Sequence, residues 1–129
     1  MRYLIAILCT VVFTAGCISD GAKLRKAAYA SFGAYVVAEE TAADVVRDKT
    51  VPADVVIKIQ KVVKVAAPIA EAMYHDLTRF AQLQDEIKGI EDAGGVATDV
   101  RMAQLSAAFQ ALQDTYAQSG EAIAALVEL

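Results

Sequence analysis

Cysteine, histidine, proline and tryptophan are scarce in this sequence. Its 129 residues include two cysteines, one histidine, two prolines and no tryptophan. Both cysteines, Cys9 and Cys17, lie close to the N-terminus, so residues 18–129 contain no thiol. Neither a disulfide nor a cysteine metal site is available to that part of the chain. We therefore expect a domain that is stabilised by packing alone.

The single histidine, His75, restricts the chemistry further. It has no cysteine partner after Cys17, and one histidine does not meet the pattern of catalytic zinc sites. Glu71, His75 and Arg79 recur at i, i+4 and i+8, with Asp76 beside them, which favours a solvated row of charges over a metal site. No glycine-rich phosphate loop follows a strand pattern. We expect no enzyme, no cofactor and no bound metal.

Basic residues are also fewer than acidic ones. Lys and Arg number 12 against 16 Asp and Glu, giving a net charge of −4. From Gly89 onward the only base is Arg101, and the acids are Glu91, Asp92, Asp99, Asp114, Glu121 and Glu128. Nucleic-acid binding needs a net basic face, so no nucleic-acid partner is expected.

The first 17 residues have the pattern of an export signal. Arg2 precedes an uncharged run from Tyr3 to Ile18. At ~1.5 Å per residue that run is about 24 Å long, shorter than the roughly 30 Å hydrocarbon core of a bilayer. A charged start, a short apolar middle and a small-residue end are typical of a secretory signal peptide.

The end of this segment, Thr14-Ala15-Gly16-Cys17, resembles the lipobox of bacterial lipoproteins, although that family more often has Leu at the position of Thr14. The resemblance implies removal of residues 1–16, acylation of Cys17 with fatty acids such as palmitate, and a short tether over residues 17–22. Ile18, rather than Asp, follows the cysteine, which implies the outer membrane, facing the periplasm or the cell exterior. An uncleaved apolar anchor and an ordinary signal peptide are the alternatives.

Residues 23–129 show helical periodicity throughout, with helices predicted at about 22–48, 52–90 and 98–127. The first is rich in small residues, including Ser31 and Gly33, which would let neighbouring helices approach closely. The other two carry apolar residues at alternating steps of four and three, a coiled-coil-like pattern. These are Val55, Ile59, Val62, Ala66, Ile69, Met73, Phe80, Leu83, Ile87 and Ile90, and then Met102, Leu105, Phe109, Leu112, Tyr116, Ile123 and Leu126.

Two breaks separate the helices, at residues 48–52 and 89–98. Thr50 or Val51 is expected to cap the second helix, and Thr98 or Ala97 the third. Pro68 lies inside the second pattern, which keeps its phase, so a kink is expected there. Ser119 is the polar member of the third seam, and Ser119-Gly120 is expected to bend or interrupt that helix. Short connections favour an all-α, antiparallel three-helix bundle with a long middle helix kinked at Pro68.

Two groups of charged residues are candidate contact surfaces. Lys23, Arg25 and Lys26 follow the acylation site, where they either contact anionic head groups or form a solvated first turn. A second candidate is a partner face on the middle helix, of which the simpler interpretation is a solvated face; its residues are Lys58, Lys61, Lys64 and Asp76. Asp76 interrupts an apolar seam, and we expect it to lie at the rim with Leu77 in the core.

These observations favour a membrane-anchored helical lipoprotein that acts by protein–protein contact in the bacterial envelope. Its partners would be the membrane, through acylated Cys17, and either a second copy or another envelope protein. One alternative is a phage-encoded lipoprotein, for lysis of the outer-membrane spanin kind or for superinfection exclusion. Another is a periplasmic carrier whose bundle holds an apolar ligand where the alanine-rich first helix underfills the core.

Overall fold

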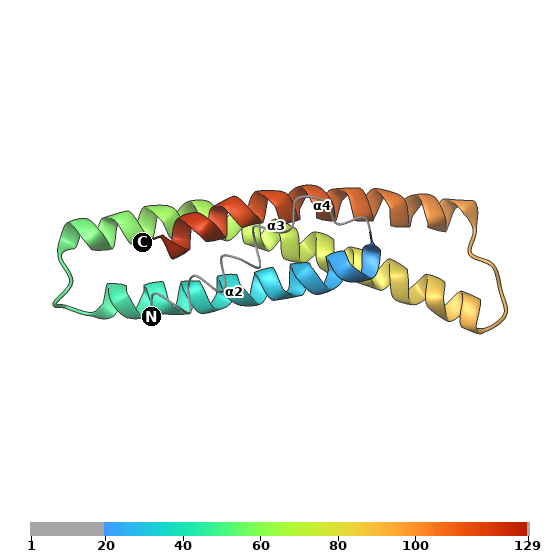
Figure 1. Cartoon of the computed structure of the whole chain (residues 1–129), viewed down its shortest axis with the longest axis horizontal. Coiled ribbons are helices and arrows are strands. Elements are labelled where there is room, and N and C mark those ends of the chain that lie inside the picture. The colour runs from blue at the N-terminus through green and yellow to red at the C-terminus, as the bar shows by residue number, and fades with distance from the viewer. Residues whose placement is uncertain (1–19, 129) are drawn as a thin grey trace.

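The structure, a computed structural model, describes residues 20–128. They form three α-helices and no strand: α2 (Gly21–Arg47), α3 (Ala53–Asp92) and α4 (Asp99–Val127). Successive helices run antiparallel along one long axis (Figure 1). The all-α three-helix bundle is thus confirmed, and each helix begins and ends within two residues of its predicted bounds. The expected signal peptide, residues 1–16, and the acylation site Cys17 lie outside the described residues.

The helix ends follow from short polar side chains. Asp20 caps α2, because its carboxylate accepts a hydrogen bond of 2.9 Å from the Ala22 N–H. In the turn after α2, Asp48 Oδ1 accepts bonds from the Thr50 N–H at 2.9 Å and from the Thr50 hydroxyl at 2.7 Å. The predicted cap of α3 by Thr50 or Val51 is therefore wrong. Pro52 occupies the N-cap position without a side-chain bond.

The long helix α3 is unbroken across Pro68, which lies on its exposed side. Its course bends between the half that follows the α2–α3 connection and the half that approaches α4 (Figure 1). Proline lacks the N–H that would bond to the preceding turn, and its ring crowds that turn. The helix nevertheless continues through Pro68 without reversing, as predicted, while a kink at Pro68 itself stays a prediction.

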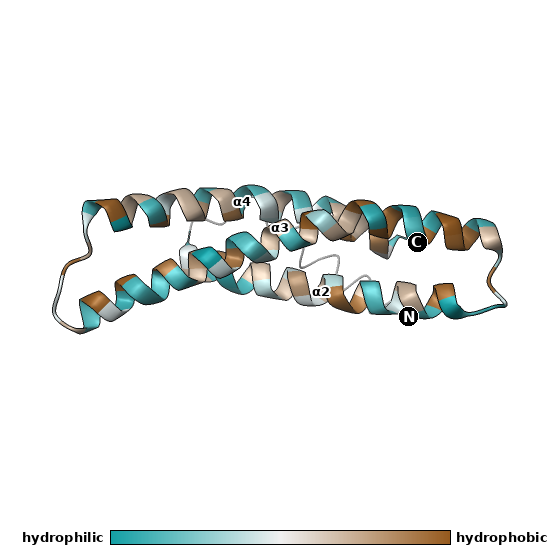
Figure 2. Ribbon diagram, turned by 180° about the vertical axis from the view of Figure 1, so that it is seen from behind, coloured by the Kyte–Doolittle hydropathy of each residue, from teal (hydrophilic) through white to brown (hydrophobic). Residues whose placement is uncertain are grey.

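Hydrophobic and hydrophilic residues alternate along every helix (Figure 2), and the buried apolar side chains form two clusters. The first comprises Leu24, Ala28, Met73, Leu77, Phe80, Leu83, Ala108, Leu112 and Tyr116. The second comprises Tyr35, Ala66, Ala70, Ile123 and Leu126. The interface between α3 and α4 is the most extensive of the three helix–helix interfaces. Since α2 supplies mostly small side chains, α3 and α4 dominate the core.

A pair of buried serines lies between the two clusters. Ser31 of α2 and Ser119 of α4 are 3 % and 0 % exposed, and their hydroxyl oxygens are 3.5 Å apart. Ser119 Oγ donates to the Tyr116 carbonyl at 2.8 Å and lies 3.1 Å from Met73 Sδ. The Ser119 hydroxyl bonds back to a carbonyl of its own helix, yet α4 is continuous through Ser119-Gly120 to Val127, so the interruption expected there does not occur.

Most residues of the two predicted seams are buried or half-buried, but Val55 and Met102 are 39 % and 46 % exposed. Both lie near ends of the bundle where one of the three helices is missing. In Figure 1, the C-terminal end of α4 does not reach as far as the start of α3. At the opposite end of the bundle, the first turn of α2 does not reach as far as the α3–α4 connection. The apolar pattern therefore extends beyond the three-helix part of the bundle.

The predicted close approach at Gly33 is wrong, because a Cβ built on this exposed residue would have no neighbour within 4 Å. The close approach is at Gly21 instead. A Cβ there would lie 2.9 Å from Gln84 Nε2 and 3.0 Å from Phe80 Cζ. The first residue of α2 thus packs against the second half of α3. This contact determines how far α3 and α4 extend past the start of α2.

Backbone bonds close the end of α3 in a Schellman motif. Gly94 has φ of 83°, and its N–H donates to the Glu91 carbonyl at 3.0 Å. The Gly95 N–H donates to the Ile90 carbonyl at 2.9 Å. Thr98 then caps α4 by accepting from the Arg101 N–H at 3.2 Å. Glycine and threonine together define a tight α3–α4 hairpin.

Candidate contact surfaces

The first turns of α2 carry the three basic residues that were expected to contact lipid head groups. Lys23 and Lys26 are exposed and form no ion pair with a described residue. Arg25 is half-buried instead. Its Nη1 donates to Asp85 Oδ1 at 2.9 Å, and Nη2 lies 3.5 Å from Oδ2. Arg25 therefore joins α2 to α3, and only Lys23 and Lys26 remain available to a membrane surface.

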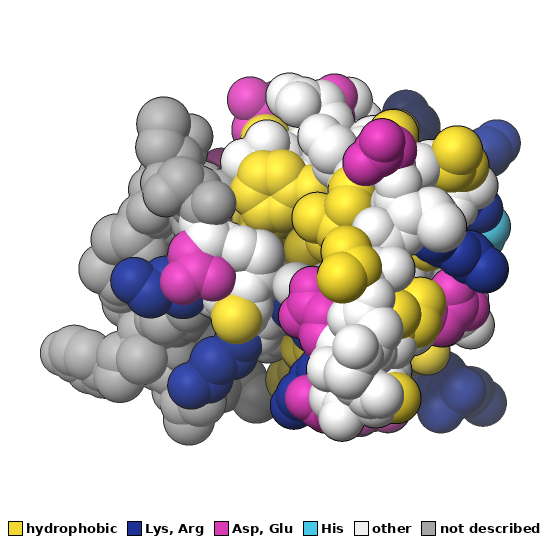
Figure 3. All heavy atoms as spheres, turned by 90° about the vertical axis from the view of Figure 1, so that its right-hand side faces the viewer, with side chains coloured by type: hydrophobic (Ala, Val, Ile, Leu, Met, Phe, Trp, Pro, Cys, Tyr) yellow, Lys and Arg dark blue, Asp and Glu magenta, His cyan; other side chains and the backbone are white. Residues whose placement is uncertain are grey.

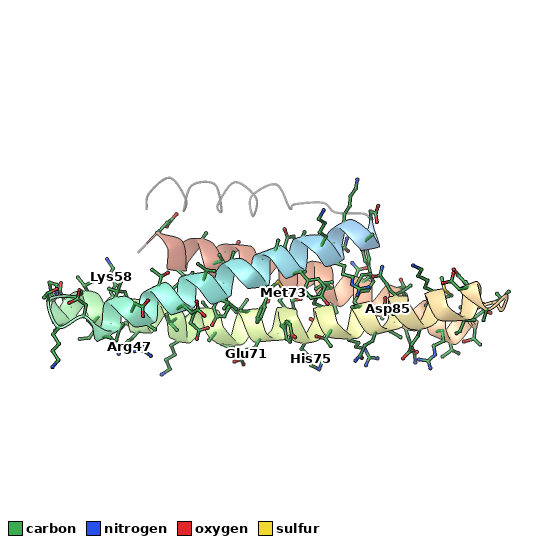
Figure 4. The ribbon with its side chains drawn as sticks, turned by 90° about the horizontal axis from the view of Figure 1, so that it is seen from below. Arg47, Lys58, Glu71, Met73, His75 and Asp85 are labelled. Atoms are coloured by element: carbon green, nitrogen blue, oxygen red, sulfur yellow. The ribbon has the colours of Figure 1, made fainter. Side chains whose placement is uncertain are left out.

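The Arg25–Asp85 pair also changes the acidity of its carboxylate. The hydrogen bond from the guanidinium is the main cause that holds the pKa of Asp85 below its usual value. The same bond raises the pKa of Arg25. Figure 4 shows Asp85 on α3 beside the start of α2. The pair fixes the register of α2 against α3 close to the first turn of α2.

The end at which α3 passes into α4 exposes apolar side chains. We call residues 93–102 the hairpin tip. Its Val96, Val100 and Met102 are 89 %, 67 % and 46 % exposed. Within the tip, Arg101 Nη1 lies 3.0 Å from Glu86 Oε2, which ties the first turn of α4 to α3. Figure 3 looks onto this end and shows hydrophobic side chains among acidic and basic ones.

A second apolar surface lies along the edge shared by α2 and α3. We call Tyr29, Phe32 and Tyr74 the aromatic face. The Phe32 and Tyr74 rings stack across the two helices with centroids 4.5 Å apart. Tyr29 lies between Arg25 and Phe32, both of which contact α3, so it shares this edge. Tyr29 and Tyr74 are 47 % and 46 % exposed, which leaves much of both rings open to a partner.

The basic row of α3 lies near the other end of the bundle. Lys58, Lys61 and Lys64 are all exposed, and none forms an ion pair within residues 20–128. Figure 4 places Lys58 in the same end of the bundle as Arg47, the last residue of α2. The row and the aromatic face are therefore separate surfaces of α3.

Asp76 lies at the rim of the core, as expected. Its side chain is 23 % exposed, whereas Leu77 is fully buried. His75 Nδ1 lies 3.8 Å from Asp76 Oδ1, but the His75 side chain is 82 % exposed. Glu71 and His75 lie along the outer side of α3, away from Met73 between the helices (Figure 4). Within residues 20–128, no three His, Cys, Asp or Glu side chains gather closely enough to hold a metal ion.

No family model, curated protein or solved structure matches this chain. None of the described helices is both long enough and apolar enough to span a bilayer. The function must therefore be inferred from the surfaces described above and from the first 17 residues.

Sequence reasoning did not single out the aromatic face or the hairpin tip. The first predicted helix, which holds Tyr29 and Phe32, is characterised only by its small residues. Tyr74 is off the seam of the second, so periodicity assigns these three residues to no surface in particular. Val96 falls in a turn, where apolar residues carry no periodic signal. A count of apolar residues left outside the seams would have found all four, but the folded arrangement is needed to place Phe32 on Tyr74.

Proposed function

We propose that this chain is a lipid-anchored helical lipoprotein of the bacterial outer membrane, facing the periplasm or the cell exterior, and that it acts by protein–protein contact. The main observation in support of this proposal is that the lipobox-like Thr14-Ala15-Gly16-Cys17 comes directly before a capped helix. Only Ile18 and Ser19 separate Cys17 from the N-cap Asp20. Acylation at Cys17 would anchor the chain firmly, since each acyl methylene buried in the bilayer contributes ~0.8 kcal/mol of binding free energy. The short stretch after Cys17 would then hold the bundle close to the bilayer.

The aromatic face is the surface best suited to a protein partner. Tyrosine is enriched at protein interfaces, because its ring buries a large apolar area while its hydroxyl bonds with water or with the partner. The stacking of Phe32 on Tyr74 holds one ring in place before any partner binds. Anchored chains are confined to two dimensions, which raises their effective concentration. We propose a second copy of this chain as the first partner, and another envelope protein as the alternative.

The membrane anchor is tested by metabolic labelling with a clickable fatty acid. Wild type should incorporate the label, and Cys17→Ala should not, because the thiol that receives the diacylglyceryl group is then missing. Migration in a denaturing gel should report removal of residues 1–16 in the same samples. Equal labelling of the two proteins, or of neither, would contradict the anchor.

The protein contact is tested with a photo-crosslinking amino acid introduced at Tyr74 in the anchored protein. Crosslinks from position 74 should yield a dimer or one defined envelope partner, while the same group at the exposed Gln110 of α4 should not. For purified Ile18–Leu129, Tyr74→Ala should weaken self-association about tenfold or more, as expected for loss of an interface aromatic. Val65→Ala, an exposed apolar position on the other side of α3, is the matched control.

A chain that stays monomeric at every concentration, and that yields no crosslink from position 74, would contradict contact through the aromatic face. Co-purification of an apolar molecule with that monomer would instead favour the ligand carrier. The exposed Lys58, Lys61 and Lys64 provide a further check. If the basic row also binds a partner, crosslinks from position 61 should report it, and high salt should suppress them.

A further inference from the structure

The hairpin tip combines the most exposed large apolar side chain among the described residues with two others nearby. Val96 is 89 % exposed, followed by Val100 at 67 % and Met102 at 46 %. They lie on the connection and in the first turn of α4, at one end of the bundle. Gly94 and Gly95 close the connection with backbone bonds, so these side chains are presented by a tight turn.

The tip extends past the start of α2, on the side opposite to the direction in which that helix runs (Figure 1). Gly21 lies beside Phe80 and Gln84, and α3 continues from there to Asp92. At ~1.5 Å per residue, the stretch from Gln84 to Asp92 rises about 12 Å, and the connection adds to this. Figure 1 shows the α3–α4 hairpin projecting beyond the first turn of α2.

The chain between the acylation site and the bundle is too short to offset this overhang. At ~3.3–3.6 Å per residue, the stretch from Cys17 to Gly21 spans at most about 14 Å when fully extended, whereas the overhang is about 12 Å plus the connection over residues 93–98. With the long axis of the bundle upright and Cys17 at the bilayer, the tip therefore reaches the membrane surface even if the tether is fully stretched. Any tilt toward the tip presses it further into the interface.

The charges near the tip indicate which kind of membrane contact is possible. Residues 86–102 carry the acids Glu86, Glu91, Asp92 and Asp99 against the bases Lys88 and Arg101. Arg101 is already paired with Glu86. Anionic lipid would therefore repel the tip, whose contact with a membrane must come from apolar burial among zwitterionic head groups, at ~25 cal/mol per Å² of apolar area.

We propose that the hairpin tip inserts Val96 and Val100 into the interface of a zwitterionic bilayer and so sets the orientation of the anchored bundle. This proposal rests on the proposed lipid anchor at Cys17. The anchor supplies the affinity, and the tip determines which end of the bundle faces the membrane. The aromatic face, which lies along the edge shared by α2 and α3, is then held away from the lipid and open to a neighbouring protein.

The experiment uses the full acylated protein in phosphatidylethanolamine-rich vesicles. Because Cys17 is blocked by acylation and Cys9 is removed with the signal, one introduced cysteine is the only free thiol. Val96→Cys and Val100→Cys are labelled with an environment-sensitive fluorophore. Lys49→Cys, in the exposed connection at the other end of the bundle, is the matched control. The readouts are emission wavelength and quenching by aqueous iodide and by brominated lipid.

Emission from positions 96 and 100 should shift to the blue on reconstitution. Quenching by iodide should fall several-fold, and brominated lipid should quench both positions but leave position 49 unaffected. High salt should leave these signals unchanged. Labels at 96 and 100 that respond like the label at 49, in protein that floats with the vesicles, would overturn tip insertion and leave the anchor standing.

Loss of the tip signal in high salt would also overturn the proposal, because it would assign the contact to Lys23 and Lys26 instead. Failure of the protein to float, together with absent acyl labelling, would overturn the anchor and the tip contact with it. A Val96→Asp, Val100→Asp double variant further separates the effect of the lipid anchor from that of the tip contact. It should still float, but a label at Met102→Cys in that background should lose its protection from iodide.

Discussion

Arg25 of α2 and Asp85 of α3 are 60 residues apart in the chain, yet Nη1 of one lies 2.9 Å from Oδ1 of the other. This pair is the ionic contact that joins the start of α2 to the second half of α3. It lies beside Gly21, which packs against Phe80. Together, the two contacts hold the helix that would follow the membrane anchor.

The Arg25–Asp85 pair predicts an acid-dependent loss of stability. The pKa of Asp85 is lower in the folded protein than in the unfolded chain. Its contribution is therefore present above the unfolded value of about 3.9 and is lost as pH falls through the folded pKa. Asp85→Asn should lower the melting temperature slightly at neutral pH, and the difference from wild type should vanish in acid.

The control for that pair is a double-variant cycle. Arg25→Gln and the double variant should melt like Asp85→Asn, because each removes the same contact. All differences should shrink in high salt, since Asp85 is 66 % exposed and the pair is open to screening. Additive effects of the two substitutions would contradict direct pairing.

Tyr35 predicts a loss of stability in alkali. It is 4 % exposed, and burial, with Glu39 as a secondary cause, raises its pKa to about 12. Its contribution is complete below the unfolded value of about 10 and is lost as pH rises toward 12. Tyr35→Phe should therefore flatten the decline of unfolding free energy over that range, as measured by urea denaturation at successive pH values.

Tyr116 provides a second part of the same prediction, because burial raises its pKa also. The double Tyr35→Phe, Tyr116→Phe variant should flatten the alkaline decline more than either single change. Phenolate absorbance should show these two groups ionising with the unfolding transition. If Tyr35→Phe declines as steeply as wild type, the assigned burial effect is wrong.

Two glycines predict opposite effects of alanine. Gly33 lies inside α2 with open space around its Cα, so Gly33→Ala should stabilise the protein by about 0.5–1 kcal/mol through helix propensity. Gly94 has φ of 83°, and Gly94→Ala should destabilise it by about 1–2 kcal/mol. Chemical denaturation of both variants tests this, and effects of the same sign would contradict the assigned backbone conformations.

Leu112 predicts a large effect of truncation. It is fully buried in the larger core cluster, so Leu112→Ala should cost ~2–5 kcal/mol of unfolding free energy. Gln110→Ala, two positions earlier on the exposed side of α4, should change it by less than ~0.5 kcal/mol. Comparable losses in urea denaturation would mean that the seam of α4 is not its packing face.

Periodicity was sufficient to predict the helices and their order. It also predicted that Leu77 occupies the core while Asp76 lies at the rim, because these features depend on neighbours three and four positions away. It did not predict where each helix ends relative to its partners. Val55 and Met102 continue the seam pattern but are exposed, since the pattern records which face is apolar and not how far the facing helix extends.

The sequence also did not predict the contacts between residues far apart in the chain. Nothing in the order of residues links Arg25 to Asp85, or Phe32 to Tyr74, because each pairing depends on the register of two helices joined through a five-residue turn. The expected cap by Thr50 failed for a local reason. The Asp48 carboxylate lies two residues away and takes both the Thr50 N–H and its hydroxyl.

The parallel course of α2 and α4 has a practical consequence for reporter fusions. Both helices run from the tip-bearing end toward the opposite one (Figure 1), and α4 spans about 43 Å at ~1.5 Å per residue. A reporter or affinity tag joined after α4 would therefore be carried on the end of the bundle remote from Asp20. Such a fusion could report the compartment and the neighbours of the protein in living cells without occupying the end that we assign to the membrane.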